Sequence, residues 1–185
     1  DCFVEDAGRR DFTINALSCD RQGRIFDPFD GVADLLAGHI RFVGDPVTRI
    51  REDYLRILRY FRFFARFGRV PPDRATLVAL AQESAGLARL SAERIRAELL
   101  KLLTGPNVLA SLAFMDETGV LAAVLGDVGD LPRLARLLHI APEAAAVDAI
   151  GRLAALVRGR ASASALAERL RLSQRERKRL AGLVE

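Results

Sequence analysis

Two short clusters of charged residues contain the side chains in this sequence that could do chemistry. The first is Arg9-Arg10-Asp11-Phe12-Thr13-Ile14-Asn15-Ala16, and the second is Glu52-Asp53-Tyr54-Leu55-Arg56-Ile57-Leu58-Arg59, followed closely by Arg62. In the first cluster, guanidinium groups can neutralise a phosphate, and a carboxylate can accept a hydrogen bond from a ribose hydroxyl. It is a candidate nucleotide grip, although two arginines beside an aspartate are also typical of a solvated corner.

The second cluster places Asp53 and Arg56 three residues apart, a spacing that commonly only decorates a helix surface. A carboxylate only accepts hydrogen bonds and a guanidinium only donates them. Side by side, they match the edge of cytosine or adenine, where an amino group lies next to an unprotonated ring nitrogen. Guanine and uracil present a carbonyl beside an N–H, and unpaired buried partners reject a wrong ligand strongly. The pair therefore predicts selection of C and A over G and U.

The elements that must position these clusters begin with one long helix, predicted over residues 45–68. Pro46 suits its first turn and Gly68 suits its end. At about 100° per residue, the charged side chains fall on one side and the apolar ones on the other. Arg62 breaks this pattern because it lies towards the apolar side, where it must reach solvent or meet an anion.

The rest of the chain divides into a short first part and a helical remainder. Apolar runs over residues 16–19 and 24–26 flank Arg21-Gln22-Gly23 and predict a hairpin, followed by a helix over 32–36 and a strand over 40–43. A hairpin alone is marginal in water, so we expect the rest of its sheet to lie upstream. Further helices are predicted over 74–86, 91–103, 107–119, 120–125, 131–139, 143–158 (opened by Pro142), 164–171 and 174–184, with a linker over 160–164. The predicted fold class is mainly α with a short β-hairpin.

Composition sets broad limits. The 185 residues are 50% hydrophobic with a formal charge of +4, and lysine occurs only at Lys101 and Lys178. Arginine suits phosphates and base edges, although high genomic GC content gives the same bias. Cys2 and Cys19 make no metal spacing, and no apolar run approaches a membrane span, so we expect a cytoplasmic protein without a membrane partner. The chain begins with Asp1 and its only methionine is Met115, so we expect a piece of a longer protein.

Three segments in order, RRDFTINAL, DPFDGVADL and RIREDYLRILR, resemble successive motifs of the class II CCA-adding enzyme and bacterial poly(A) polymerase family. The segment SAERIRAELLKLL resembles the family's next motif, so the likeness covers about residues 5–104. It implies the end of an α/β nucleotidyltransferase head over residues 1–44, a helical neck over 45–105 and a helical, RNA-binding body over 106–185. The implied activity is addition of C and A to tRNA 3′ ends from CTP and ATP. A poly(A) polymerase, which uses ATP only, and a helical RNA-binding module without catalysis remain open.

The resemblance also assigns roles to single residues. It gives the ribose and phosphates of the incoming nucleotide to Arg9, Arg10 and Asp11, and the protein template that reads the base to Asp53 and Arg56. Further nucleotide contacts fall to Arg59 and Arg62, and supporting roles to Glu52, which would orient the template, and Asn15. Residues 27–31 lie where the family has a hinge, with Asp30 in place of the expected glycine.

The family's catalytic centre, a Gly-rich segment and an Asp-x-Asp pair that holds two Mg²⁺ ions, has no counterpart in this sequence. We therefore expect the catalytic and metal-binding residues upstream of Asp1, and predict that this chain alone is inactive. A C-terminal group of basic residues could hold RNA backbone or form a solvated helix face: Arg169, Arg171, Arg175, Arg177, Lys178 and Arg179. His39 and His139 have no ligand spacing and are predicted to be structural.

Overall fold

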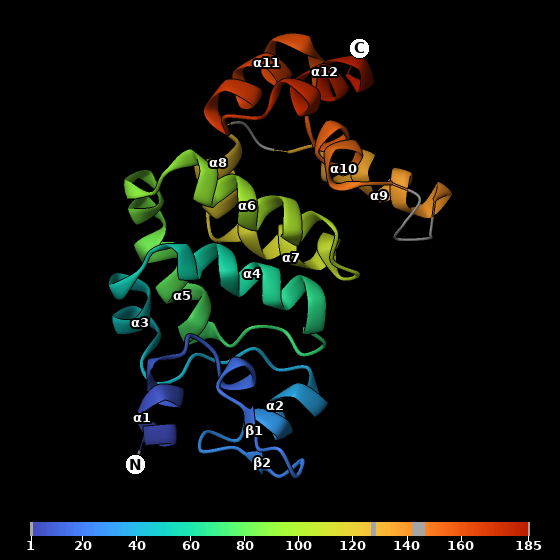
Figure 1. The fold of residues 1–185 in the computed structure, drawn as a ribbon. Coiled ribbons are helices and arrows are strands. Elements are labelled where there is room, and N and C mark those ends of the chain that lie inside the picture. The colour runs from blue at the N-terminus through green and yellow to red at the C-terminus, as the bar shows by residue number, and fades with distance from the viewer. Residues whose placement is uncertain (1, 127–128, 142–146, 185) are drawn as a thin grey trace.

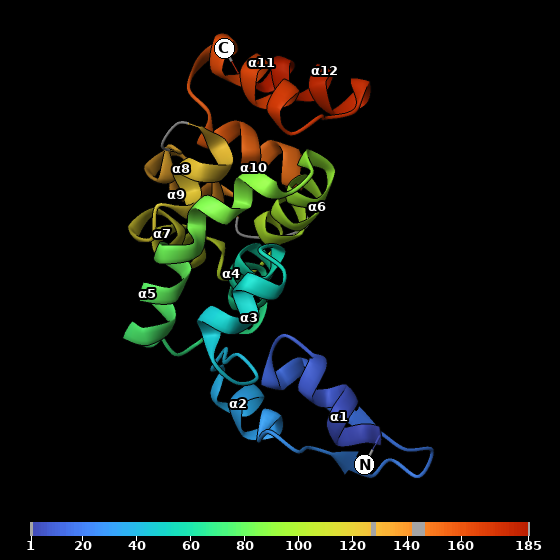
Figure 2. The ribbon, with the colours of Figure 1, turned by 90° about the vertical axis from the view of Figure 1, so that its left-hand side faces the viewer.

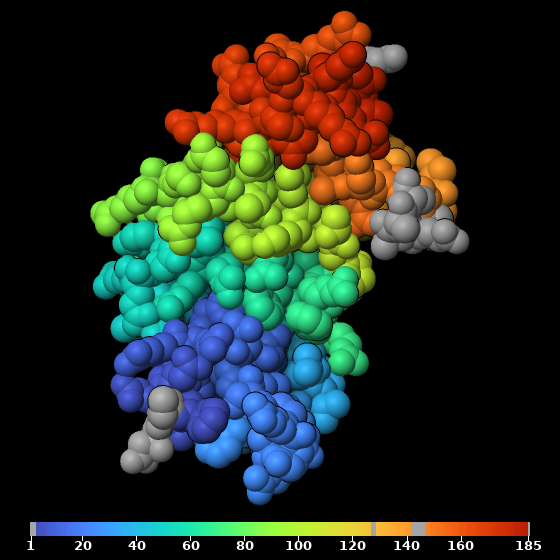
Figure 3. Space-filling view, viewed as in Figure 1, coloured from blue at the N-terminus to red at the C-terminus, as the bar shows by residue number. Residues whose placement is uncertain are grey.

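The computed structural model describes residues 2–126, 129–141 and 147–184. The helices are stacked along one long axis, from the hairpin and α1 at one end to α11 and α12 at the other (Figures 1 and 2). The space-filling view shows consecutive segments as successive bands along this axis (Figure 3). The structure is mainly α with one two-stranded antiparallel sheet, as predicted.

The N-terminal part contains α1 (Cys2–Arg9), a 3-10 helix (Thr13–Asn15), β1 (Ser18–Cys19), β2 (Ile25–Phe26) and α2 (Gly31–Ala37). The hairpin is confirmed, with Ser18 opposite Phe26 and Gly23 in the turn at φ +82°. The predicted strand over 40–43 is wrong. Only an isolated bridge between Phe12 and Phe42 forms there, because the neighbouring chain turns into the 3-10 helix at Thr13 and leaves the ladder.

The predicted long helix is two helices, α3 (Pro46–Glu52) and α4 (Leu55–Phe67). Asp53 between them is extended, at φ −155° and ψ 107°. Its carboxylate accepts a hydrogen bond from the backbone N–H of Leu55, 3.1 Å away, which satisfies a free donor at the start of α4. The ring of Tyr54 lies against Gly86, where an added Cβ would come within 2.0 Å of it. The break is therefore stabilised by the hydrogen bond to Asp53 and by the packing of Tyr54 against Gly86.

The remaining helices are α5 (Arg74–Glu83), a 3-10 helix (Ser84–Arg89), α6 (Ala92–Leu103), α7 (Val108–Glu117), α8 (Val120–Leu125), α9 (Leu131–Ile140), α10 (Ala149–Leu156), α11 (Gly159–Arg169) and α12 (Gln174–Leu183). The predicted helices matching α6, α7, α8, α9 and α12 are confirmed, with Ser91 and Ser173 as N-caps. The helix predicted over 74–86 ends at Glu83 and continues as the 3-10 helix.

Two predictions near the C-terminus are wrong. The segment 160–164 is not a linker, because it lies within α11, where Ala163 is buried in the core. The helix predicted over 143–158 begins only at Ala149, since Asp148 caps it by accepting from the N–H of Gly151. Pro142 and residues 143–146 of that prediction lie outside the described residues.

One large apolar core runs through most of the chain, from Phe12 near the hairpin to Val184 behind α12. The apolar side of α4 is its centre, because Ile57, Leu58 and Phe61 are fully buried between α6 and α7. Burial on this side leaves the charged side of α3 and α4 facing the end of α1. None of the described helices is long and apolar enough to cross a lipid bilayer.

Candidate functional site

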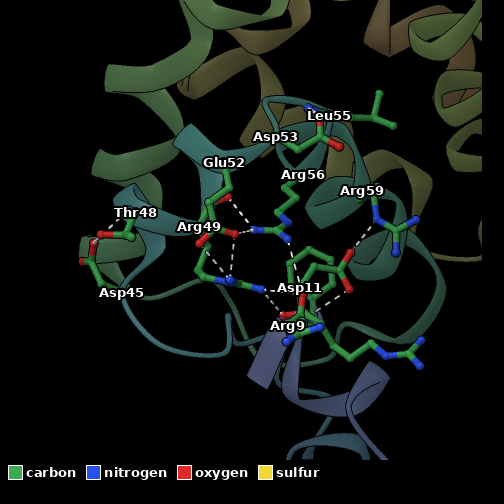
Figure 4. A network of polar contacts seen from close by, with 12 residues as sticks. Arg9, Asp11, Asp45, Thr48, Arg49, Glu52, Asp53, Leu55, Arg56 and Arg59 are labelled. Carbon is green, nitrogen blue, oxygen red and sulfur yellow. Dashed lines mark hydrogen bonds and ion pairs between the residues drawn. The ribbon is translucent and has the colours of Figure 1, made fainter. Parts of the chain in front are cut away.

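An open pocket of about 330 Å³ lies where the end of α1 meets the break between α3 and α4 (Figure 4). It is lined by Arg9, Arg10, Asp11, Asn15, Asp53, Leu55, Arg56, Arg59 and Arg94. The structure therefore brings both charged clusters of the sequence to one place. Of the predicted site residues, Glu52 and Arg62 are not among those that line the pocket.

Asp11 is the buried carboxylate of the pocket, with 5% of its surface exposed. It pairs with the guanidinium of Arg59 on α4, and it accepts hydrogen bonds from the side chain of Asn15 at 2.8 Å and from its neighbour's backbone N–H. Burial raises the pKa of Asp11, but the hydrogen bonds from Arg59 and Asn15 outweigh it and hold that pKa below its usual value. The carboxylate is therefore ionised at neutral pH and acts only as an acceptor.

Arg9 and Arg10 stand at the exposed end of α1. Their guanidinium groups pair with Glu5 at 2.7 Å and Asp6 at 2.9 Å, one helical turn back. Exposed pairs of this kind contribute little to stability. Both cations can therefore exchange their carboxylates for an incoming anion at little cost.

Asp53 is held by two partners at the break between the helices. One oxygen accepts from the N–H of Leu55 and the other from the guanidinium of Arg94 on α6, 2.7 Å away. Arg94 was not predicted as a site residue. The sequence signal for it was its place in the first turn after the N-cap Ser91, within the segment that resembles the family's fourth motif.

Arg56 is also held by protein groups. Its Nη1 donates to Glu52 at 2.5 Å and to the carbonyl of Arg49 at 2.8 Å. The hydrogen bond from Arg56 is also the main reason why the pKa of Glu52 is lowered. Asp53 and Arg56 line the same pocket. Their backbones are joined by a hydrogen bond of 2.9 Å from the N–H of Arg56 to the carbonyl of Asp53, whereas the side chain of Arg56 is bonded to Glu52 and that of Asp53 to Arg94. The orienting role of Glu52 stays a prediction.

Arg62 lies towards the apolar side of α4, where an anion was expected beside it. The anion is the carboxylate of Glu98 in this protein. The Nε of Arg62 lies 2.5 Å from Glu98 on α6, and its guanidinium lies over the ring of Phe63 at 4.5 Å. The predicted contact between Arg62 and a nucleotide stays a prediction.

Arg49 is a second residue that sequence reasoning left out of the site. It lies beneath the pocket, between the carbonyl groups at the end of α1 and the carboxylate of Glu52 (Figure 4). The signal available in the sequence was its place on the over-charged side of the predicted long helix.

The C-terminal basic residues lie outside this pocket. Within the described part of the chain, no group of three or more His, Cys, Asp and Glu side chains could hold a metal ion. Four of the six C-terminal basic residues are engaged by protein groups: Arg169 with the carbonyl of Ala123, Arg171 with Glu93, Arg177 with the carbonyl of Leu172 and Arg179 with Asp148. His39 lies 3.4 Å from the carboxylate of Asp34.

Two family models match this chain. The model described as "Poly A polymerase head domain" matches residues 2–41, and the one described as "Probable RNA and SrmB- binding site of polymerase A" matches residues 71–137. Together they cover the first charged cluster and the helices from α5 to most of α9.

Relatives with known names agree with these matches. The chain is 38% identical over 184 residues to CCA tRNA nucleotidyltransferase 1, mitochondrial, of Danio rerio, covering 95% of this chain and 41% of the relative. The Bacillus stearothermophilus CCA-adding enzyme, solved in complex with CTP, is 33% identical with a TM-score of 0.62, over 98% of this chain and 43% of that one. The Thermotoga maritima CCA-adding enzyme complexed with tRNA_CCA is 26% identical with a TM-score of 0.72, over 96% and 47%.

The chain thus spans less than half the length of each of these relatives. The likeness extends over nearly the whole of this chain, both in sequence and in the arrangement of the helices. The chain belongs to the family of CCA-adding enzymes and bacterial poly(A) polymerases.

Proposed function

We propose that this chain supplies the nucleotide grip and the base-selecting template of a tRNA nucleotidyltransferase that adds C and A to tRNA 3′ ends. The observation that carries the proposal is the pocket itself. It places the carboxylate of Asp53 and the guanidinium of Arg56 in one pocket with Asp11, although the sequence separates Asp11 from them by more than 40 residues. Relatives solved with CTP and with tRNA support this assignment.

Base selection follows from the hydrogen bonds that remain available. Each oxygen of Asp53 has one protein partner, and a carboxylate offers about four acceptor positions, so Asp53 can still accept the amino group of cytosine or adenine. Nη1 of Arg56 donates to Glu52 and to the carbonyl of Arg49, whereas the contact of Nη2 with the described residues is a long one, of 3.5 Å, to the carbonyl of Arg9. Arg56 can therefore donate to the unprotonated ring nitrogen beside that amino group.

The sugar and the phosphates of the nucleotide would be bound by the side of the pocket that the end of α1 forms. The ionised carboxylate of Asp11 can accept a hydrogen bond from a ribose hydroxyl. Arg9 and Arg10 can exchange their exposed carboxylate partners for the phosphates of the triphosphate. Arg59 holds Asp11 in place and adds positive charge beside it. This division gives each charged residue of the pocket one role.

The reaction also needs Mg²⁺, which activates the attacking hydroxyl and neutralises the leaving pyrophosphate in enzymes of this class. The described residues offer no set of ligands for such ions, so we assign no step to a metal here. We propose that the purified chain adds no CMP or AMP to tRNA lacking its 3′ end. Incorporation of labelled nucleotide by the 185-residue chain would contradict this.

Calorimetric titration of the chain with CTP, ATP, GTP and UTP tests the template. We expect CTP and ATP to bind at least about tenfold more tightly than GTP and UTP, and Asp53→Ala to abolish that difference. Asp116→Ala, a change at an exposed carboxylate on α7, is the matched control and should leave it unchanged. Equal binding of all four nucleotides by the unaltered chain would overturn the template.

The same titration separates the second candidate, a poly(A) polymerase, which the descriptions of the matching family models favour. Adenine satisfies the pair of Asp53 and Arg56 as well as cytosine does, so the pair alone does not decide between them. Binding of both CTP and ATP supports the CCA-adding function, whereas binding of ATP without CTP supports the polymerase. Binding of RNA without any nucleotide would indicate a module that only holds RNA.

A further inference from the structure

Arg49 joins the two halves of the pocket from below. Its Nη2 donates to the carbonyl oxygens of Arg9 at 2.7 Å and Arg10 at 2.5 Å, the last residues before Asp11. Its Nη1 donates to both carboxylate oxygens of Glu52, at 2.9 and 2.7 Å. One guanidinium therefore ties the peptide that leads into Asp11 to the carboxylate beside the template (Figure 4).

The contacts continue from Glu52 to Arg56. The Glu52 oxygen that accepts from Arg49 at 2.7 Å also accepts Nη1 of Arg56 at 2.5 Å, and the same Nη1 donates to the backbone carbonyl of Arg49. Arg49 thus holds Arg56 in two ways, through its own carbonyl and through Glu52. Each link is charge-assisted or involves a guanidinium donor, which makes it stronger than a neutral hydrogen bond.

The shape of the side chain makes this arrangement sensitive to displacement. Only 11% of the Arg49 side chain is exposed, and its Nε is buried without a hydrogen-bond partner in the part of the chain that the structure describes. The side chain is held by its Nη groups, whose directions are fixed in one planar fork. If the end of α1 moved relative to α3, Arg49 would lose hydrogen bonds on one side or the other. A cation is also favourable there because the carbonyl end of a helix is its negative end.

We propose that Arg49 is a positioning residue, which fixes the distance between the grip at Asp11 and the base-reading Arg56 and so sharpens the selection of C and A. The inference rests on the proposed function of Asp53 and Arg56. Arg49 does not line the pocket, so its effect on a nucleotide passes through Glu52, Arg56 and the peptide before Asp11.

The test compares Arg49→Ala and Arg49→Lys with Arg51→Ala in the 185-residue chain. Arg51 lies on the same helix but pairs with Glu83 at the surface, so it matches Arg49 in residue type and element. We measure the NMR signals of the Arg56 Nε–H and the Asp11 backbone N–H without nucleotide, and the ratio of CTP to UTP affinity by calorimetry. We expect Arg49→Ala to shift both signals and lower the ratio about tenfold, the scale on which orienting partners act.

Lysine keeps the charge but not the fork, so Arg49→Lys should give an intermediate ratio, and Arg51→Ala should change neither measurement. If Arg49→Ala does not fold, Arg49→Lys carries the same comparison. If Arg49→Ala keeps the ratio of CTP to UTP affinity of the unaltered chain, the inference about Arg49 is wrong, whereas the proposed function is unaffected. If the unaltered chain binds all four nucleotides alike, the proposed function fails, and unmoved signals in Arg49→Ala would independently overturn the positioning role.

Discussion

The guanidinium of Arg94 on α6 lies 2.7 Å from the carboxylate of Asp53, a residue 41 positions earlier in the chain. The pair joins the break between α3 and α4 to α6, so a helix outside the second charged cluster contributes a side chain to the pocket. It adds a cation to a site that already contains four arginines. The pocket is therefore more positive than the two clusters alone indicate, which suits a triphosphate.

The pair of Arg94 and Asp53 should contribute little to stability. Its side chains are 47% and 36% exposed, and exposed ion pairs are worth up to about 1 kcal/mol. We expect a double-mutant cycle of Arg94→Ala and Asp53→Ala, followed by urea unfolding, to give a coupling free energy no larger than about 1 kcal/mol, and less in high salt. A coupling of several kcal/mol that salt leaves unchanged would contradict this, and would mean that solvent does not screen the pair.

Asp11 and Arg59 should give a pH-dependent contribution to stability. Because the pKa of Asp11 is held below its usual value of 3.8 in the folded chain, the unfolded chain binds a proton at Asp11 more readily than the folded chain does. The stabilisation is complete above about pH 5, falls as the pH passes through 3.8, and is lost below the folded pKa. We expect Asp11→Asn to lower the free energy of unfolding by about 2 kcal/mol at pH 7, the scale of a hydrogen bond to a charged group.

The measurement is urea unfolding of the chain and of Asp11→Asn between pH 3 and 7. The difference between them should shrink as the pH falls below 5, so the variant has the shallower acid limb. Asp6→Asn changes an exposed carboxylate on α1 and serves as the control, with less than about 1 kcal/mol expected at neutral pH. A constant difference across the whole pH range would show that Asp11 is not the group responsible.

Much of the fold follows from local signals in the sequence. Asp45, Asp73, Ser91 and Ser173 cap their helices as their types indicate. The break at Asp53 does not follow from such signals, because the apolar positions keep a helical period on both sides of it. The long-range contacts at the break are the ring of Tyr54 against Gly86 and the bond from Asp53 to Arg94. Both contacts join segments more than 30 residues apart, where local patterns carry no information.

The geometry of the candidate site could likewise be predicted only in part, because the contacts between distant segments leave no local signal in the sequence. Residue types and spacing identified the two clusters, and the structure brings them to one pocket. The partners of these residues could not be read from spacing: Arg94 for Asp53, Glu98 for Arg62, and the carbonyls of Arg9 and Arg10 for Arg49. An arginine on a charged helix face has the same sequence signature whether it meets water or a buried carbonyl. Only the packing of α6 and α1 against that face separates the two cases.

Gly86→Ala should disrupt the break between α3 and α4. The added Cβ would lie 2.0 Å from the ring of Tyr54, so the ring or the backbone must move, and overpacking of this kind costs about 1–3 kcal/mol. We expect a corresponding loss in the free energy of unfolding and partial recovery in Gly86→Ala with Tyr54→Ala. Gly182→Ala in α12 meets open space and should stabilise by about 0.5–1 kcal/mol. Equal effects of the two glycine changes would contradict the contact.

Arg62 and Glu98 give the last prediction. Glu98 is buried, and besides Arg62 its ion-pair partner among the described residues is Lys101 at 3.8 Å. Removing one member of a buried pair leaves a poorly compensated charge, whereas replacing both with apolar residues is often neutral. We expect Arg62→Ala to lower the free energy of unfolding by about 3 kcal/mol, and Arg62→Met with Glu98→Leu to restore most of it.

The double variant Arg62→Met with Glu98→Leu also tests the nucleotide contact that the family resemblance assigns to Arg62. Because this variant is expected to keep its stability, a change in its CTP affinity reports binding and not unfolding. Weaker CTP binding at constant selectivity would place Arg62 near the phosphates, since phosphate contacts carry no base preference. Unchanged CTP affinity would show that Arg62 does not bind the nucleotide. Its role would then be structural, because it links α4 to α6 through Glu98 and packs on the ring of Phe63. If the double variant does not recover its stability, then Arg62 and Glu98 also stabilise the fold through contacts other than their ion pair.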